Sequence, residues 1–301
     1  MQGYGFVAVG GPEQQAFVEV DEPRPGPGEL LVTVRAAGVN PGDWKVREGG
    51  YGAAAGPAVL GREVAGTVLE VGAGVDAFAV GDEVFGGCPD MLGGWAPRAR
   101  VTAGFAARRP DGVSAPDAAV LPVAAGTAWD ALVQLDLPEG ATLLVNGGGG
   151  GVGVPVIQLA VARGLRVIAT ASPAKHGLLT DFGAIPVAYG DGVVERIREV
   201  EPEGVDGIFD MVGGDPLRAV ASLLTAPERL ISIADYGLST ELGGQQIVRD
   251  RSTAVLERLA AHVADGRLDP YVTDVRPLAD AAAALALVED GHATGKVVLT
   301  P

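Results

Sequence analysis

The spacing of apolar residues changes character near residue 118. Up to that point short apolar runs alternate with Gly and Pro, which predicts β-strands separated by turns. The clearest runs are ELLVTVRAAGVN (29–40), VAGTVLEVG (64–72) and GDEVFGG (81–87). The turn-rich stretch EPRPGPGE (22–29) is expected to join the first two strands. The first part of the chain is therefore expected to be a β-rich domain.

From about residue 120 strand-like runs alternate with helical ones. The runs in order are TLLVN, VGVPVIQLAVARG, RVIAT, PAKHGLLTDFGA, IPVAY, VVERIREV, VDGIFDMV, DPLRAVASLL and RLISIA. Alternation at short loop lengths is typical of βαβ units on a parallel sheet. After residue 250 the pattern predicts two amphipathic helices and a closing strand, in VLERLAAHVADG, LADAAAALALVEDG and GKVVLT (295–300).

Five consecutive glycines, 147–151, stand between the strand-like TLLVN and the helical run after it. The spacing Gly148-x-Gly150-x-x-Gly153 fits a dinucleotide-binding loop in its required strand–turn–helix context. The first glycine permits a tight turn, the second lets the backbone approach a pyrophosphate, and the third lets the helix pack on the strand. A flexible linker fits less well, because βαβ units follow. We therefore expect the cofactor to contact Gly148, Gly150, Gly151, Val152 and Gly153.

The residues after the second strand of this part distinguish NAD from NADP. An NAD site usually places Asp or Glu there to bind the ribose 2′-OH. The stretch RVIATASPAKH contains no acid, and Ser172 and Lys175 follow the strand instead. A hydroxyl and a cation suit a 2′-phosphate, which an acid would repel. Ser172 could also cap the following helix. We predict NADPH as the cofactor, with Tyr189 beside its adenosine end.

Composition limits the class of protein. The chain has 301 residues, enough for two domains, and 48% of them are hydrophobic. Its net charge of −16 disfavours binding to nucleic acid or anionic lipid. No run approaches the ~18 apolar residues of a membrane span, and MQGYGFVAVG lacks the pattern of a secretory signal. We expect a cytoplasmic protein with a small-molecule substrate and no nucleic-acid or membrane partner.

Short motifs follow one another in a specific order over essentially the whole chain. They are AAGVNPGDWKVREG (36–49), PAVLGREVAGTVLEVG (57–72), VGDEVFG (80–86), LPVAAGTAWDAL (121–132), LLVNGGGGGVG, ATASPAKH, FDMVGG (209–214) and GHATGKVVL (291–299). In this order they resemble the medium-chain dehydrogenase/reductase superfamily, and within it the zinc-free quinone oxidoreductase branch.

The resemblance implies an α/β fold with two domains. Residues 1–118 and 255–301 would form a GroES-like β-barrel catalytic domain, and residues 119–254 an inserted Rossmann domain that binds NADP. The resemblance also implies a homodimer, whose geometry is left open by the short, Gly-rich stretch 235–250.

Zinc-dependent members of that superfamily carry a Cys after the second strand and a His in a Gly-His-Glu motif. This chain has Asn40 and Arg62 at those places. Its one cysteine, Cys88, also excludes a four-cysteine zinc lobe and is expected to be a small loop or core residue. The three histidines, 176, 262 and 292, are scattered along the sequence. We expect no metal, which disfavours alcohol dehydrogenation because that branch uses zinc as a Lewis acid.

The resemblance also implies positions for site residues. The substrate cleft would be lined by Asn40, Asp43, Trp44 and Lys45, with Tyr51 on the loop opposite. Thr127 would lie near the nicotinamide ribose, with Ile233 and Ala234 behind the nicotinamide ring. The catalytic candidates are Asn40, Asp43, Lys45 and Tyr51.

Each candidate in the first domain also has a purely structural interpretation. Asn40 could begin a turn before Pro41. Asp43 and Lys45 could be solvated or pair with each other. Glu63 could buttress the site, or pair with Arg62 or with a backbone donor. Lys45 stands where many quinone oxidoreductases have a tyrosine. It could polarise a carbonyl, stabilise an enolate, protonate one, or point to solvent.

These expectations favour an NADPH-dependent oxidoreductase that transfers hydride, without zinc, to a quinone or an α,β-unsaturated carbonyl. The hydride chemistry belongs to the cofactor, and the protein supplies orientation and electrostatics. A second hypothesis is a low-turnover NADPH-binding redox sensor or scaffold protein. A third, a nucleic-acid-binding module, is disfavoured by the negative charge. Turnover with a simple acceptor would separate the first two.

Overall fold

The chain forms two compact units. The computed structural model describes residues 1–52, 56–291 and 293–301. Unit 1 contains residues 1–126, 251–266 and 270–301, and unit 2 contains residues 127–250 with 267–269. Residues 119–126, which the sequence analysis assigns to the second domain, stay with unit 1. One reason is that the backbone N–H of Val123 donates to the Glu63 carboxylate at 2.7 Å.

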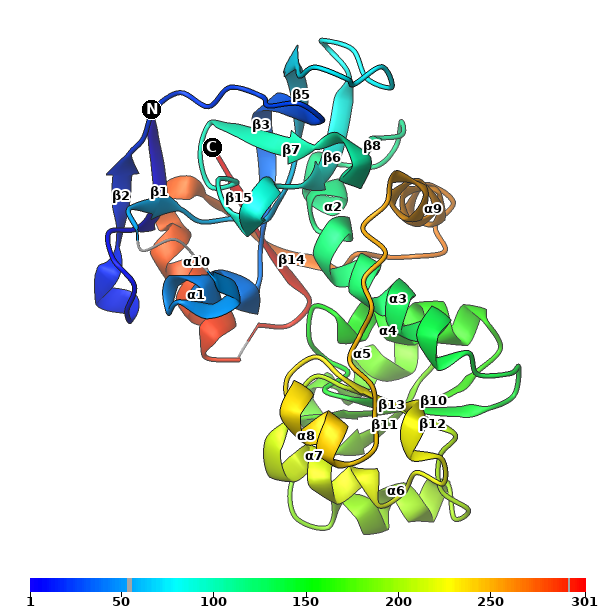
Figure 1. The fold of residues 1–301 in the computed structure, drawn as a ribbon. Coiled ribbons are helices and arrows are strands. Elements are labelled where there is room, and N and C mark those ends of the chain that lie inside the picture. The colour runs from blue at the N-terminus through cyan, green and yellow to red at the C-terminus, as the bar shows by residue number, and fades with distance from the viewer. Residues whose placement is uncertain (53–55, 292) are drawn as a thin grey trace. The chain divides into compact units, whose positions relative to one another are not determined.

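Unit 1 is built around β3 (Glu29–Val39), its longest strand (Figure 1). The larger sheet has the order β14 (Val272–Pro277), β15 (Lys296–Thr300), β3, β5 (Glu63–Val71), β6 (Glu83–Gly87) and β8 (Ala106–Arg108), and β7 (Arg98–Thr102) also pairs with β3. A second sheet has the order β2 (Gln15–Glu19), β1 (Gln2–Phe6) and β4 (Ala58–Val59).

The expectation that residues 22–29 join the first two strands is wrong. Both β1 and β2 precede that loop, which leads from β2 to β3. The strand β1 was not predicted, because the glycines of QGYGF lower its strand propensity. Gly5 is needed there, since a Cβ at this residue would lie only 1.8 Å from the Ala58 carbonyl oxygen on β4.

Among its described residues, unit 1 has the α-helices α1 (Pro41–Arg47), α2 (Ala115–Ala119), α9 (Thr253–Ala264) and α10 (Ala281–Glu289). Helices α1 and α10 lie side by side (Figure 1). The fully buried Arg47 joins them, because its Nη1 and Nη2 donate to the Glu289 carboxylate at 3.0 and 2.8 Å. Its Nε donates to the Gly10 carbonyl oxygen at 3.0 Å. These contacts fix the position of α1, which carries the catalytic candidates Asp43 and Lys45 and follows Asn40 directly.

Unit 2 is a doubly wound α/β domain. Its parallel sheet has the order β11 (Ile185–Ala188), β10 (Arg166–Ala171), β9 (Thr142–Asn146), β12 (Gly207–Asp210) and β13 (Leu230–Ser232). The helices are α3 (Gly126–Leu135), α4 (Gly153–Ala162), α5 (His176–Asp181), α6 (Val193–Val200), α7 (Gly214–Ala221) and α8 (Tyr236–Glu241). After β9 the strands β10 and β11 are added on one side of the sheet, and β12 and β13 on the other. Ligands of such sheets bind outside the carboxyl ends of the strands at the point where the order changes, here between β9 and β12. The predicted fold class is confirmed.

The core of unit 2 follows from its apolar strands. Leu144, Ile168 and Ile208 on β9, β10 and β12 are fully buried, as expected for parallel strands that are covered on both faces. At the edge of the sheet, Gln245 forms a parallel bridge to Ile231 of β13. Among the described residues, no helix is both long and apolar enough to cross a bilayer. The cytoplasmic location stays a prediction.

Candidate functional site

The glycine loop in unit 2 is held against the end of β10. Gly147 has a φ of +96°, and its N–H donates to the Thr170 hydroxyl at 2.9 Å. A Cβ at Gly148 would lie 2.8 Å from the Ala169 side chain, and one at Gly153 only 2.4 Å from the Gly148 carbonyl oxygen. At Gly150, by contrast, the nearest atom to an added Cβ is 3.7 Å away. Of the three glycines of the fingerprint, Gly148 and Gly153 are therefore tightly packed and Gly150 has open surroundings, which fits a backbone that receives a pyrophosphate.

Lys175 lies across this loop. Its Nζ donates to the Gly149 carbonyl oxygen at 3.2 Å, and a Cβ at Gly149 would come within 2.5 Å of the Lys175 side chain. Partial burial lowers the pKa of the Lys175 ammonium group. The structure thus brings a cation from the end of β10 to the predicted phosphate loop.

Ser172 begins the turn that carries Lys175. A 3₁₀ turn over Pro173–Lys175 precedes α5, so the helix expected over PAKHGLLTDFGA is divided in two. The Ser172 carbonyl oxygen accepts from the Lys175 N–H at 2.9 Å, whereas its side chain makes no capping hydrogen bond. The capping interpretation of Ser172 is therefore wrong for its hydroxyl, and the predicted contact with a 2′-phosphate stays a prediction.

A chain of buried polar side chains joins the carboxyl ends of four strands in unit 2. The Thr170 hydroxyl donates to Asn146 Oδ1 at 2.7 Å, and Asn146 Nδ2 donates to Asp210 Oδ1 at 2.7 Å. The Ser232 hydroxyl donates to Asp210 Oδ2 at 2.6 Å. Asp210 also accepts from the N–H groups of Val212 and Gly213 at 3.2 and 3.0 Å. This Thr170–Ser232 chain links the glycine loop to the loops after β12 and β13.

The remaining cofactor candidates are spread along the same unit. Ile233 and Ala234 directly follow β13, and the Ala234 N–H donates to the Ser232 hydroxyl at 3.2 Å. Tyr189 directly follows β11 and is 64% exposed. Thr127 is buried in the first turn of α3, where its hydroxyl accepts from Arg249 Nη1 at 2.7 Å. Ile233, Ala234 and Tyr189 therefore lie at the carboxyl edge of the sheet.

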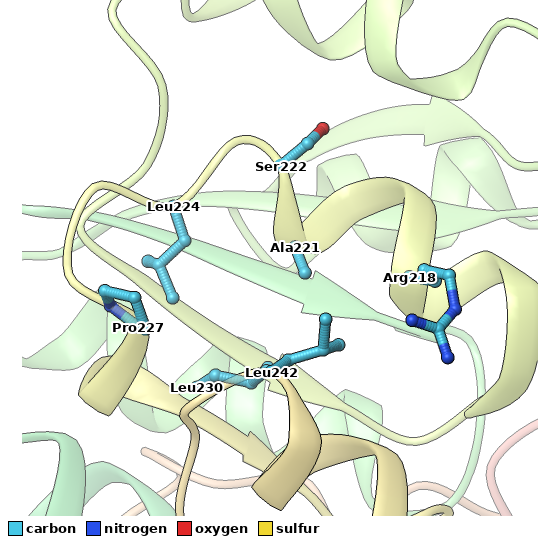
Figure 2. A pocket seen from close by; sticks show the side chains of 7 residues that line it. All are labelled: Arg218, Ala221, Ser222, Leu224, Pro227, Leu230 and Leu242. Atoms are coloured by element: carbon cyan, nitrogen blue, oxygen red, sulfur yellow. The ribbon is translucent and has the colours of Figure 1, made fainter.

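Unit 2 also contains a small pocket (Figure 2). Its volume is about 260 Å³, and it is lined by Arg218, Ala221, Ser222, Leu224, Pro227, Leu230 and Leu242. Leu230 is the first residue of β13, so the pocket is at the amino end of that strand. None of the predicted cofactor residues lines it, and ligands of parallel sheets bind at the opposite end. We do not assign the cofactor to this pocket.

In unit 1, Asn40 belongs to a buried polar cluster. Its Nδ2 donates to Glu63 Oε1 at 2.8 Å, and its Oδ1 accepts from Lys296 Nζ. Lys296 Nζ also donates to the Val39 carbonyl oxygen at 3.0 Å and lies 3.5 Å from Glu63 Oε1. Burial lowers the pKa of the Lys296 ammonium group, and the Glu63 carboxylate opposes that shift. Both ends of the Asn40 amide are thus engaged, and Glu63 pairs with Lys296 rather than with Arg62.

Asp43 pairs with Arg62 instead of Lys45. The Asp43 carboxylate is fully buried, with Oδ1 3.4 Å from Arg62 Nε and Oδ2 accepting from the Asn40 N–H at 2.8 Å. Burial raises the pKa of Asp43 to about 6, although the Arg62 guanidinium opposes that shift. The structure therefore contradicts both structural interpretations of Asp43, a solvated residue and a partner of Lys45.

Lys45 and Tyr51 lie near aromatic and cationic neighbours. Lys45 Nζ lies 5.5 Å from the centre of the Trp44 ring, and the side chain is half-buried. The Tyr51 ring centre lies 5.3 Å from Arg62 Cζ, and Tyr51 is 52% exposed with a φ of +59°. Residues 53–55 of the loop that carries Tyr51 lie outside the described residues.

No role was predicted from the sequence for Lys296, Asp210 or Arg249, and Arg62 was predicted only to replace a zinc-ligand histidine or to pair with Glu63. Two signals were present: Lys296 is charged at the start of an apolar strand, and Asp210 is an acid at the end of one. Cys88 is buried as expected, and burial raises the pKa of its thiol. Within residues 1–52, 56–291 and 293–301 no three His, Cys, Asp or Glu side chains are grouped as metal ligands. His292 lies outside these ranges.

Comparisons with known proteins agree with this architecture. A family model described as "Alcohol dehydrogenase GroES-like domain" matches residues 26–123, and one described as "Zinc-binding dehydrogenase" matches residues 183–299. The quinone oxidoreductase from Coxiella burnetii superposes with a TM-score of 0.91 and 28% identity, covering 100% of this chain and 99% of that one.

Two curated relatives show similarity along most of the sequence. The chloroplastic NADPH-dependent alkenal/one oxidoreductase of Arabidopsis thaliana is 32% identical over 287 residues, covering 91% of this chain and 72% of that protein. Erythronolide synthase EryA2 of Saccharopolyspora erythraea is 35% identical over 290 residues, covering 91% of this chain. The chain spans only 8% of the length of that synthase. This chain belongs to the medium-chain dehydrogenase/reductase family of oxidoreductases.

Proposed function

We propose that this protein is an NADPH-dependent oxidoreductase that reduces quinones or α,β-unsaturated carbonyls without zinc. The observation that carries the proposal is the set of residues that follow β10. No acid lies between Arg166 and His176, and Lys175 reaches from there to the Gly149 carbonyl oxygen in the glycine loop. A cation beside the loop favours the extra phosphate of NADP, whereas NAD sites place an acid there.

The residues of unit 2 would divide the binding of the cofactor between them. Gly148, Gly150, Gly151, Val152 and Gly153 would hold the pyrophosphate, and Ser172, Lys175 and Tyr189 the adenosine and its 2′-phosphate. Thr127, Ile233 and Ala234 would hold the nicotinamide end. When bound, NADPH supplies the hydride. The Thr170–Ser232 chain would keep these loops in one conformation.

The proposal of zinc independence rests on the side chains at the places where related enzymes hold zinc. Both ends of the Asn40 amide are engaged, by Glu63 and Lys296. Arg62 presents a guanidinium that is always charged and has no lone pair for a metal. Thiolate and imidazole are the ligands that tetrahedral zinc usually takes.

The substrate class is proposed from relatives and from the cationic character of α1. The names of the relatives refer to quinones and to alkenals or enones. Lys45 and Tyr51 are our candidates for contact with the substrate, and Asp43 and Asn40 for positioning it. The half-buried Lys45 ammonium can donate to a carbonyl oxygen or supply a proton.

Oxidation of NADPH by the purified protein, with NADH alongside, tests the proposal against a panel of quinones, enals and enones. We expect turnover with at least one acceptor and a preference for NADPH. Lys175→Ala should reduce that preference at least about tenfold, since a charge-assisted hydrogen bond contributes ~1.5–3 kcal/mol. Arg166→Ala is the matched control, because Arg166 is a cation at the opposite end of β10 and pairs with Glu201 at 3.0 Å.

The outcomes separate the alternatives. Equal use of NADH and NADPH would contradict the assignment of Lys175. Tight NADPH binding without turnover of any acceptor would favour the redox sensor over the reductase. Failure to bind either cofactor would contradict the interpretation of the glycine loop itself.

We also propose a homodimer, which the family resemblance implies. A dimer that extends the parallel sheet at β13 would compete with Gln245, whose N–H donates to the Leu230 carbonyl oxygen at 2.8 Å. Light scattering of the purified protein measures the state directly, and a monomer at all concentrations would contradict this part of the proposal.

A further inference from the structure

Arg62 lies in an enclosed position beside α1. A Cβ at Gly42 would come within 2.2 Å of Arg62 Cζ and Nη2, so the guanidinium packs directly on the backbone of Gly42. Asp43 Oδ1 lies 3.4 Å from Arg62 Nε, and the centre of the Tyr51 ring lies 5.3 Å from Arg62 Cζ. The Arg62 side chain is only 11% exposed. Glycine at residue 42 is what admits the guanidinium.

The guanidinium of Arg62 retains unused donors. Its Nη2 is buried and has no hydrogen-bond partner among the described residues, and its Nε contact with Asp43 is not aligned as a hydrogen bond. The other arginine of this region, Arg47, uses Nε, Nη1 and Nη2 in hydrogen bonds to Gly10, Glu48 and Glu289. Asp43 Oδ1, which lies 3.4 Å from Arg62 Nε, is also without a hydrogen-bond partner in the described part of the chain. A buried donor without a protein acceptor is costly, so it calls for another acceptor such as a water, an ion or a ligand.

We propose that Arg62 binds the carbonyl oxygen of the substrate through a guanidinium N–H group that no protein acceptor among the described residues occupies, and stabilises the negative charge that this oxygen gains during reduction. The inference rests on the proposed function and identifies the group that holds the acceptor. A guanidinium suits this task because it keeps its charge at every accessible pH and is weakly hydrated. Asp43 and Tyr51 both lie next to the guanidinium and would position it, in addition to the contact with substrate that we propose for Tyr51.

The reaction needs such a group. Addition of hydride to the β-carbon of an enone forms a C–H bond and moves the two π electrons of the C=C bond toward the carbonyl, which gives an enolate. A proton from solvent or from a nearby group such as Lys45 then adds to the α-carbon and restores the C=O bond. NADPH is oxidised to NADP⁺ and the enone becomes a saturated ketone. A donor aimed at an oxygen whose charge develops in the transition state contributes about 10²–10³-fold in rate.

The experiment compares wild type with Arg62→Ala and Arg62→Lys in two measurements. The first is enone reduction, where Arg62→Ala should lower kcat/KM by about a hundredfold, with partial recovery on addition of methylguanidinium. The second is calorimetric binding of crotonate with NADP⁺ present, because its carboxylate imitates the oxygen of the enolate. Crotonate should bind Arg62→Ala at least about tenfold more weakly than wild type, and Arg62→Lys between the two.

Arg109→Ala is the matched control. Arg109 is another barrel arginine of limited exposure, at 23%, and its Nη2 lies 2.6 Å from Glu83 Oε2. We expect it to lower thermal stability without changing crotonate binding or responding to methylguanidinium. A structural role for Arg62 would give Arg62→Ala that same pattern.

Failure of the two proposals can be told apart. If wild type reduces enones and Arg62→Ala keeps its kcat/KM within threefold, about 0.6 kcal/mol, Arg62 does not bind the reacting oxygen. If wild type reduces no acceptor, the proposed function fails, and crotonate still decides on Arg62. Crotonate binding that depends on Arg62 supports the site, while equal binding, or none, overturns it.

Discussion

Replacing Asp210 by Asn should loosen the loops that we assign to the cofactor. The Asp210 carboxylate is fully buried and accepts from Asn146, Val212, Gly213 and Ser232. An amide has one oxygen, so Asp210→Asn can satisfy the donors on one side only. Ser232 cannot compensate by accepting, because its hydroxyl already accepts from the N–H groups of Ala234 and Asp235.

The expected size follows from the two donors that lose their acceptor. A buried donor left unsatisfied costs about 1–3 kcal/mol. Two such losses at ~1.5 kcal/mol each predict that Asp210→Asn lowers the free energy of unfolding by about 3 kcal/mol. Urea denaturation measures this directly. Because the loops after β12 and β13 lose a common anchor, we also expect NADPH to bind at least about tenfold more weakly, or 1.4 kcal/mol.

Asp206→Asn is the matched control at the other end of β12. Asp206 accepts one backbone hydrogen bond, from the Thr142 N–H at 2.7 Å, which the oxygen of an Asn side chain can still accept. We expect a loss below ~1 kcal/mol and unchanged NADPH affinity. If Asp210→Asn is no less stable than Asp206→Asn, the reasoning about the Thr170–Ser232 chain is refuted. If only stability falls and NADPH affinity is unchanged, its link to the cofactor is refuted.

Two further predictions concern Asp43 and Gly153. Burial raises the pKa of Asp43 to about 6 from its ordinary 3.8, so the folded protein keeps a proton that the unfolded chain releases. The contribution of Asp43 to stability therefore falls as pH rises from about 4 to 6. Over that range the free energy of unfolding of Asp43→Asn, measured by urea denaturation, should rise by up to ~3 kcal/mol relative to wild type. A difference between the two proteins that does not change with pH would contradict the raised pKa. Gly153→Ala should lose ~1–3 kcal/mol and weaken NADPH binding in the same assays, because its Cβ would lie 2.4 Å from the Gly148 carbonyl oxygen. Its control is Gly177→Ala, where an added Cβ meets nothing within 4 Å, and equal behaviour of the two variants would refute the packing argument.

The pattern of residues along the chain determined the parts of this protein that depend on neighbours in sequence. The glycine loop is one of them, since a strand, a turn and a helix follow one another within residues 142–162. The proposed preference for NADPH is another, because the acid that binds NAD stands at a fixed distance in sequence from the glycine loop, and this chain has no acid there. The helix predicted over PAKHGLLTDFGA was found in two pieces, because Ser-Pro begins a 3₁₀ turn before α5.

Only the tertiary structure decided how the polar side chains are paired. Lys296 and Glu63 are 233 residues apart in sequence, and no local pattern connects them. They meet because β15 and β5 both pair with β3. One register places Val297 opposite Val39, which puts Lys296 next to Asn40, and the other places Val64 opposite Ala37, which brings Glu63 to the same end of β3. The position of Arg62 against Gly42 arises in the same way, from strands and helices that pack across the barrel. The period of apolar residues specifies the elements, whereas the register of strands distant in sequence decides which buried charges become neighbours.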